Sequence, residues 1–220
     1  MRTSTTVLLL LTVVVLAPSV SATHVSGNAG QHIAGSAVQQ ACEETDEYDV
    51  IELEAENYDG SDSDQSESPF EVVADETASG GEYVRAPNAT ADRYLSSPTR
   101  SDAFENNSIS YTFDTSVEDE YVVWGRTVAP NGTSDSFWVA VDDGEPSRWF
   151  VPQSTEWEWR RVNVTTILGA DENVTYNRTL VTTPLAPGEH TLHLGVREAE
   201  TRLDTLVVTN DPDCVPASDD

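Results

Sequence analysis

From about Val50 to Asn210 the sequence is a succession of short apolar runs that alternate with polar residues and are separated by turn-forming residues. Apolar residues at every second position place one face of a strand in a core, and clusters of Gly, Pro, Asn and Asp between the runs favour turns. No long apolar stripe with helical spacing interrupts this region. Strands are therefore predicted at residues 50–56, 70–74, 82–85, 108–113, 120–128, 136–141, 148–151, 158–164, 190–197 and 203–209.

Such a series of short strands predicts an all-β protein, built as an antiparallel β-sandwich or barrel. A region of this length can bury one sizeable core, so a single domain is expected at residues 47–214. First and last strands often pair in sandwiches. The strand at 50–56 is therefore expected to lie beside the strand at 203–209.

The N-terminus has the composition of a secretory signal peptide. Arg2 is followed by an apolar run from Val7 to Ala17 and then by small residues. The run is short for a membrane anchor, so residues 1–22 are predicted to be a signal peptide, with an uncleaved anchor as the alternative. Residues 23–46 lack periodicity and are expected to form a flexible linker, and residues 215–220 an acidic tail. We therefore expect the mature chain to be secreted or at the cell surface, without membrane insertion.

The chain is strongly acidic, with 39 Asp+Glu against 11 Lys+Arg and a formal net charge of −28. All of the basic residues are Arg. A charge of this size makes a compact chain repel itself unless salt screens it, and the Debye length falls to about 3 Å at 1 M salt. The composition is typical of secreted haloarchaeal proteins. Nucleic acid and anionic membranes are poor partners for such a surface.

Two cysteines, Cys42 and Cys214, lie at the two ends of the patterned region. In an exported chain they are expected to form one disulfide, the alternative being two free thiols. Asn-X-Ser/Thr sequences mark sites at which an exported chain can carry glycans. These sites are Asn88, Asn106, Asn131, Asn163, Asn173 and Asn177.

No familiar catalytic motif is present: the sequence has neither G-x-S-x-G nor H-E-x-x-H. His190 and His193 are three positions apart, so on a strand they face opposite sides and cannot share a metal ion. Paired carboxylates can hydrolyse glycosides, but in a chain with 39 acids such a pair has no diagnostic value. A protein without enzymatic activity is therefore predicted.

The tryptophans are concentrated, with four of the five between residues 138 and 159. Trp157 and Trp159 are two apart on a predicted strand, so both indoles lie on one face. An indole beside carboxylates and Arg suits a sugar, whose apolar face stacks on the ring while its hydroxyls form hydrogen bonds. The alternative for each tryptophan is a place in the core. Trp138 differs, because it is out of phase with its apolar neighbours and should face away from them.

The stretch IELEAENYDG would place Glu52, Glu54 and Glu56 on one strand face, where like charges repel. Pairing with the last strand would bring Asp204 close to Glu54 and Glu56. Three carboxylates and nearby backbone carbonyls match the hard oxygen ligands that calcium prefers. The sequence leaves two alternatives open, a calcium site or solvated surface acids.

Several stretches resemble carbohydrate-binding modules of the family 6 and 35 type, which are galactose-binding-like β-sandwich domains with a jelly-roll fold. The resemblance covers residues 51–211, nearly all of the mature chain. The similar segments are Glu54-Ala55-Glu56, Tyr121–Arg126, Phe137–Gly144, Pro187–Leu192 and Leu203-Asp204.

The resemblance implies a structural calcium ion bound by Glu54, Glu56 and Asp204, and a sugar site on loops at one edge of the sandwich. It implies a non-catalytic module that recognises polysaccharide or cell-surface glycan, with a partner enzyme acting in trans. The alternative is a structural or adhesion module that has lost sugar binding. Residues 168–183 have no counterpart in the family, and whether they cover the site is left open. The candidate ligand-binding residues are Tyr83, Trp138, Trp149, Trp157, Trp159 and Arg197.

Overall fold

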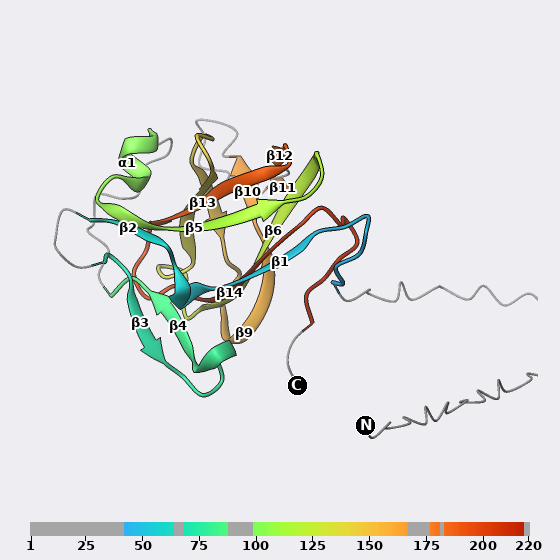
Figure 1. Ribbon diagram of the computed structural model, residues 1–220. Helices are drawn as coiled ribbons and strands as arrows, with labels where there is room; N and C mark the ends of the chain where they lie inside the picture. The colour runs from blue at the N-terminus through green and yellow to red at the C-terminus, as the bar shows by residue number, and fades with distance from the viewer. Residues whose placement is uncertain (1–41, 64–67, 88–98, 167–176, 181–182, 218–220) are drawn as a thin grey trace, which may run out of the picture. The chain divides into compact units, whose positions relative to one another are not determined.

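The computed structural model describes residues 42–63, 68–87, 99–166, 177–180 and 183–217. These residues form two antiparallel β-sheets (Figure 1). Alternate side chains of both sheets build a common core. The predicted antiparallel β-sandwich is confirmed. No helix in the described ranges has the length and apolar character needed to cross a membrane.

The first sheet has the strand order β12-β6-β14-β4-β3, and β1 and β9 add to β14 and β6 respectively. Thus β4 and β1 pair with successive parts of β14, while β12 and β9 pair with successive parts of β6. The strands are β1 (Val50–Glu54), β3 (Glu71–Ala74), β4 (Glu82–Arg85), β6 (Asp119–Ala129), β9 (Ser154–Arg161), β12 (Thr183–Leu185) and β14 (Arg202–Thr209).

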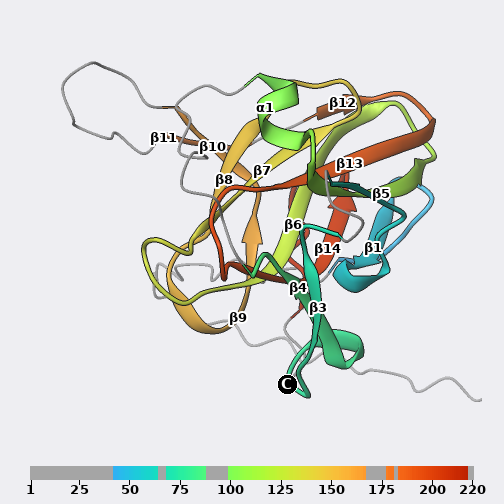
Figure 2. The ribbon, with the colours of Figure 1, turned by 90° about the vertical axis from the view of Figure 1, so that its left-hand side faces the viewer.

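The second sheet has the order β11-β10-β8-β7-β13-β5-β2. Its strands are β2 (Gly60–Ser63), β5 (Asn107–Thr115), β7 (Ser136–Val141), β8 (Ser147–Phe150), β10 (Asn163–Thr166), β11 (Asn177–Leu180) and β13 (Gly188–Val196). The described helical turns are η1 (Ala55–Asn57), η2 (Ser79–Gly81) and α1 (Arg100–Phe104), and α1 lies beside β7 and β13 (Figure 2).

The core lies between the two sheets, where the alternation of each strand points its apolar residues. Trp149 of β8 is completely buried at its centre. Gly125 of β6 makes room for this ring, because a Cβ atom at that position would lie 2.3 Å from the Trp149 indole. The large indole and the facing glycine therefore act as a complementary pair.

A second, smaller core lies on the outer face of the second sheet and holds α1 in place. It consists of Trp138 and Ala140 from β7 with Ala103 and Phe104 from α1. A capping box at Thr99 begins the helix. The prediction that Trp138 faces away from its neighbours is confirmed, but α1, which the sequence did not predict, covers its ring.

The pairing of the first and last strands is confirmed, with Val50 opposite Thr209 and Glu54 opposite Thr205. Several predicted strands differ from the observed ones by one or two end residues, and two predictions need a larger correction. The first strand ends at Glu54, and Glu56 belongs to the turn η1. The strand predicted at 158–164 is two strands, β9 and β10, because the chain passes from the first sheet to the second at Val162.

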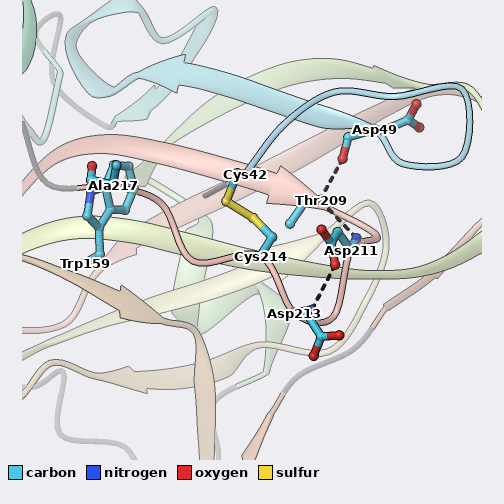
Figure 3. The surroundings of a disulfide bond; sticks show 8 residues. All are labelled: Cys42, Asp49, Trp159, Thr209, Asp211, Asp213, Cys214 and Ala217. Atoms are coloured by element: carbon cyan, nitrogen blue, oxygen red, sulfur yellow. Dashed lines mark hydrogen bonds between the residues drawn. A yellow bond between two sulfur atoms is a disulfide. The ribbon is translucent and has the colours of Figure 1, made fainter. Parts of the chain in front are cut away.

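The predicted disulfide is confirmed between Cys42 and Cys214, which are 172 residues apart (Figure 3). It ties the segment before β1 to the segment after β14. Hydrogen bonds reinforce the same junction: the Thr209 hydroxyl donates to the Asp49 carbonyl, and the Asp211 N–H donates to the Thr209 hydroxyl.

Candidate functional site

Asp204 occupies an irregular position in β14, at the point where this strand changes its partner. Leu203 pairs with β4, whereas Thr205 pairs with Glu54 of β1. The register with β6 also shifts between Leu203 and Thr205, as in a β-bulge. The bulge places the fully buried Asp204 carboxylate next to Arg126, which donates a hydrogen bond to Oδ2.

Glu54 and Glu56 approach Asp204 from the end of β1 and from η1. The turn η2 completes this group, because the Ser79 hydroxyl donates to Glu54 Oε1 (2.9 Å) and the Ser79 backbone acts to lower the pKa of Asp204. Gly80, at φ 62°, passes so close that a Cβ atom would lie 3.2 Å from Glu56 Oε1. The carboxylates of Glu54, Glu56 and Asp204 thus lie near enough to one another to repel.

These acids are electrostatically strained. Burial, together with the carboxylates of Glu54 and Asp204, raises the pKa of Glu56. Burial and Glu54 likewise raise the pKa of Asp204, although Ser79 and Arg126 oppose this shift. Glu56 Oε2 and Asp204 Oδ1 are buried without a hydrogen-bond partner. In the described part of the chain, however, no three acidic, His or Cys side chains are placed to hold one metal ion as they stand.

Arg126 links the acids to an aromatic group on the outer face of the first sheet. Its guanidinium carbon lies over the Trp157 ring, 5.7 Å from the centroid. The rings of Tyr83 and Trp157 meet in a T-shaped arrangement, with 5.3 Å between ring centroids, and Arg202 lies over Tyr83. The Trp157 N–H donates to the Thr77 hydroxyl (3.1 Å). These contacts hold the Trp157 ring in a fixed orientation, and the ring is partly exposed at the surface.

Of the predicted ligand-binding residues, Tyr83 and Trp157 meet at this surface. Tyr83 is only 4% exposed, so it packs against the indole and leaves Trp157 as the more exposed ring. Trp159 is partly exposed, but its N–H donates to the Ala217 carbonyl (2.9 Å). Trp149 and Trp138 are 0% and 2% exposed. The expectation that these two rings contact a ligand is corrected, because the two cores use them.

The expectation that Arg197 contacts a ligand is also corrected, because Arg197 is buried in a polar network. It donates to Glu198 Oε1 (2.8 Å) and to the Ser136 hydroxyl, and Ser136 donates to Glu198 Oε2 (2.8 Å). The Asp135 N–H donates to the same carboxylate oxygen. Burial and the neighbouring Glu198 raise the pKa of Asp135 to about 7. The network ties the start of β7 to the end of β13 and leaves Arg197 no surface for a ligand.

Apart from these residues, a cleft with a volume of about 620 Å³ lies beside α1. Hydroxyls of Ser61 and Ser110, the His193 ring and the Arg100 guanidinium are among the groups that line it. Burial lowers the pKa of His193, and Arg100 adds to this shift. None of the predicted site residues borders this cleft.

The glycosylation sites fall in different parts of the chain. Asn106 and Asn131 are exposed, as a glycan acceptor must be. The backbone of Asn163 lies in β10 and that of Asn177 in β11. Asn88 and Asn173 lie outside the described residues.

Sequence reasoning missed Arg126, Thr77 and Ser79 as parts of the site. Arg126 could have been found from the sequence, because it alternates with the core residues of its strand and therefore faces outward beside β9. Thr77 and Ser79 could not, because their positions depend on how the turn before β4 folds back over β14.

No family model matches this sequence, and no curated protein matches it. Similar solved structures include the C-terminal CBM6 of LamC from Zobellia galactanivorans, at 14% identity and TM-score 0.46, covering 73% of this chain and 99% of that one. The family 35 carbohydrate-binding module from Clostridium thermocellum is 13% identical, with TM-score 0.42, and the match covers 72% of this chain and 97% of that one.

A mannanase from Podospora anserina, described as GH26-CBM35, is 14% identical with TM-score 0.47. The match covers 72% of this chain but only 27% of the mannanase, so this chain spans about a quarter of that enzyme's length. At such identities these likenesses concern the fold and do not extend to a ligand.

Proposed function

We propose that this domain is a non-catalytic carbohydrate-binding module that holds a sugar ring against Trp157. The observation that supports the proposal is the partly exposed Trp157 indole on the outer face of the first sheet, which Tyr83 contacts in a T-shaped arrangement. Arg126 lies over the ring and Thr77 holds its N–H. A fixed indole loses little conformational entropy when a ligand stacks on it.

The surroundings of Trp157 also supply polar partners for the hydroxyls of a sugar. A sugar presents an apolar C–H face to an aromatic ring and its hydroxyls to polar partners. Asp75 accepts hydrogen bonds from the Thr77 hydroxyl and N–H at the exposed end of this surface. A neutral polysaccharide carries no charge, so the acidic surface does not repel it as it repels nucleic acid.

We propose in addition that calcium is a structural ion of this domain, with Glu54, Glu56 and Asp204 as its side-chain ligands. The fit is supported by the two buried oxygens, Glu56 Oε2 and Asp204 Oδ1, that have no hydrogen-bond partner. Carboxylate oxygens are the ligands that calcium prefers. The ion would relieve the repulsion among the acids and would tie the end of β1 to the bulge of β14.

We infer that the chain works outside the cell, in high salt. The signal-like N-terminus and the strongly acidic composition support this placement. The disulfide supports it too, because such bonds persist in oxidising compartments. A module of this kind would bring a partner enzyme in trans to a glycan surface.

The test is retention on a polysaccharide panel that includes β-1,4-mannan and β-1,3-galactan, measured by affinity electrophoresis in multimolar salt. Trp157→Ala should lower affinity at least about tenfold, which corresponds to roughly 1.4 kcal/mol. His193→Ala, which alters the cleft beside α1, is the matched control and should bind normally. Loss of binding in His193→Ala with normal binding in Trp157→Ala would place the glycan in the cleft and refute the proposal.

A structural or adhesion module that has lost sugar binding is the second candidate. It is favoured by the burial of Trp138, Trp149 and Arg197 and by the covered N–H of Trp159. Absence of retention on every polysaccharide would support this candidate. Release of reducing sugar would instead show an enzyme.

A further inference from the structure

The outer face of β9 carries two indoles, but the chain's own C-terminal segment engages one of them. Trp157 and Trp159 lie two residues apart and so share a face, about 7 Å apart along the strand. Arg126 pairs with Trp159 in the register of β6 and β9 and lies over the Trp157 ring. The Trp159 N–H donates to the Ala217 carbonyl, and Figure 3 shows these two residues near the disulfide. Trp157 donates instead to Thr77, in the turn before β4.

The segment that reaches Trp159 is firmly anchored. Cys214 is 1% exposed and bound to Cys42, and Pro216 is buried. Ahead of it, Asp211 accepts a hydrogen bond from the Asp213 N–H, which fixes the turn after β14 (Figure 3). The disulfide thus holds the last described residues against β9.

We propose that residues 214–217 form a cap that closes one end of the aromatic surface and limits the glycan site to Trp157. The proposal rests on the proposed function of Trp157. An indole has one polar group, its N–H, so a glycan hydroxyl that hydrogen-bonded to Trp159 would have to displace the Ala217 carbonyl. Displacing an anchored group costs the hydrogen bond that it makes, so the capped site selects a short glycan or a chain end over an extended one.

The cap can be tested without any glycan, by acrylamide quenching of tryptophan fluorescence. A chain that stops after Cys214 keeps the disulfide but loses the Ala217 carbonyl. Its quenching constant should exceed that of the full chain, and the increase should disappear when both chains carry Trp159→Phe. A full-length Pro216→Gly/Ala217→Gly variant, which loosens the segment, should show a smaller increase. An unchanged constant, or an equal increase in the Trp159→Phe background, would overturn the cap.

The glycan measurement separates this proposal from the proposed function. In the truncated chain, affinity for long oligosaccharides of the retained polysaccharide should rise several-fold, while affinity for its monosaccharide or disaccharide stays the same. If the full chain binds and truncation alters no affinity, the cap does not set specificity. If neither chain binds any glycan, the proposed function fails, and the quenching experiment alone decides whether the cap exists.

Discussion

Replacing Glu56 by Gln should change stability in opposite directions with and without calcium. Without calcium, Glu56 Oε2 is buried without a hydrogen-bond donor, beside the carboxylates of Glu54 and Asp204. A Gln amide removes one negative charge and can donate a hydrogen bond. The variant should therefore be more stable than the wild type in chelator. With calcium the wild type should be the more stable, because the variant has lost a ligand.

The size of both effects follows from the site. Relieving a buried, unsatisfied oxygen is worth about 1–3 kcal/mol, and the partial exposure of Glu56 places the gain near 1 kcal/mol. Calcium at a hundred times its dissociation constant would stabilise the wild type by about 2.7 kcal/mol. The wild type should then exceed the variant by nearly 2 kcal/mol in calcium. A domain of this size changes its melting temperature by about 2–4 °C for each kcal/mol.

The assay is thermal melting in EDTA and in excess calcium, at one fixed high concentration of sodium chloride so that screening stays constant. Glu52→Gln is the matched control. Glu52 lies on the same strand but is exposed, and it should melt like the wild type in both conditions. Equal melting of the wild type with and without calcium would refute the calcium site. An equal calcium response in Glu56→Gln would remove Glu56 from it.

Three further predictions concern stability. Reducing the disulfide, which closes a loop of 172 residues, should lower the free energy of unfolding by at most about 5 kcal/mol, as denaturant titration with and without reductant can measure. Because burial and Glu198 raise the pKa of Asp135 to about 7, this group stabilises the fold at low pH and loses that contribution as pH rises from about 4 through 7. Asp135→Asn should therefore remove about 1–2 kcal/mol of the fall in stability between pH 5 and pH 8, and an unchanged slope would contradict this reasoning. Gly125→Ala should cost about 1–3 kcal/mol, because its Cβ would overlap the Trp149 ring, and a wild-type melting temperature would show that the core gives way there.

The sheets were predictable from the sequence wherever a strand alternates between a core and a polar face. β4, β6, β7 and β14 have that pattern, and the structure places them as predicted. β2 reads GSDS and has no apolar residue, so only its pairing with β5 reveals it as a strand. α1 has five residues and depends on Trp138 for its position, a contact that periodicity cannot show.

The candidate site was predictable to the extent that strand pairing determines it. Pairing of the first and last strands was enough to bring Glu54 and Asp204 together, and the structure agrees. Whether an aromatic ring is open to a ligand was not predictable, because a strand pattern shows which face a ring is on but not what covers that face. Trp138 and Trp159 both point outward, yet α1 covers the first and the Ala217 carbonyl meets the second.

One turn, before β4, contacts both parts of the candidate site. Residues 75–81 supply Thr77 to the Trp157 N–H and Ser79 to Glu54, so a single turn touches both the aromatic group and the acids. Arg126 makes a second connection, because it holds Asp204 and lies over Trp157, and it also donates to the Thr77 carbonyl. An ion that drew the acids together would act on the same turn and the same Arg that orient the indole. Calcium and glycan should therefore bind with positive coupling, and by linkage glycan should raise calcium affinity by the same factor.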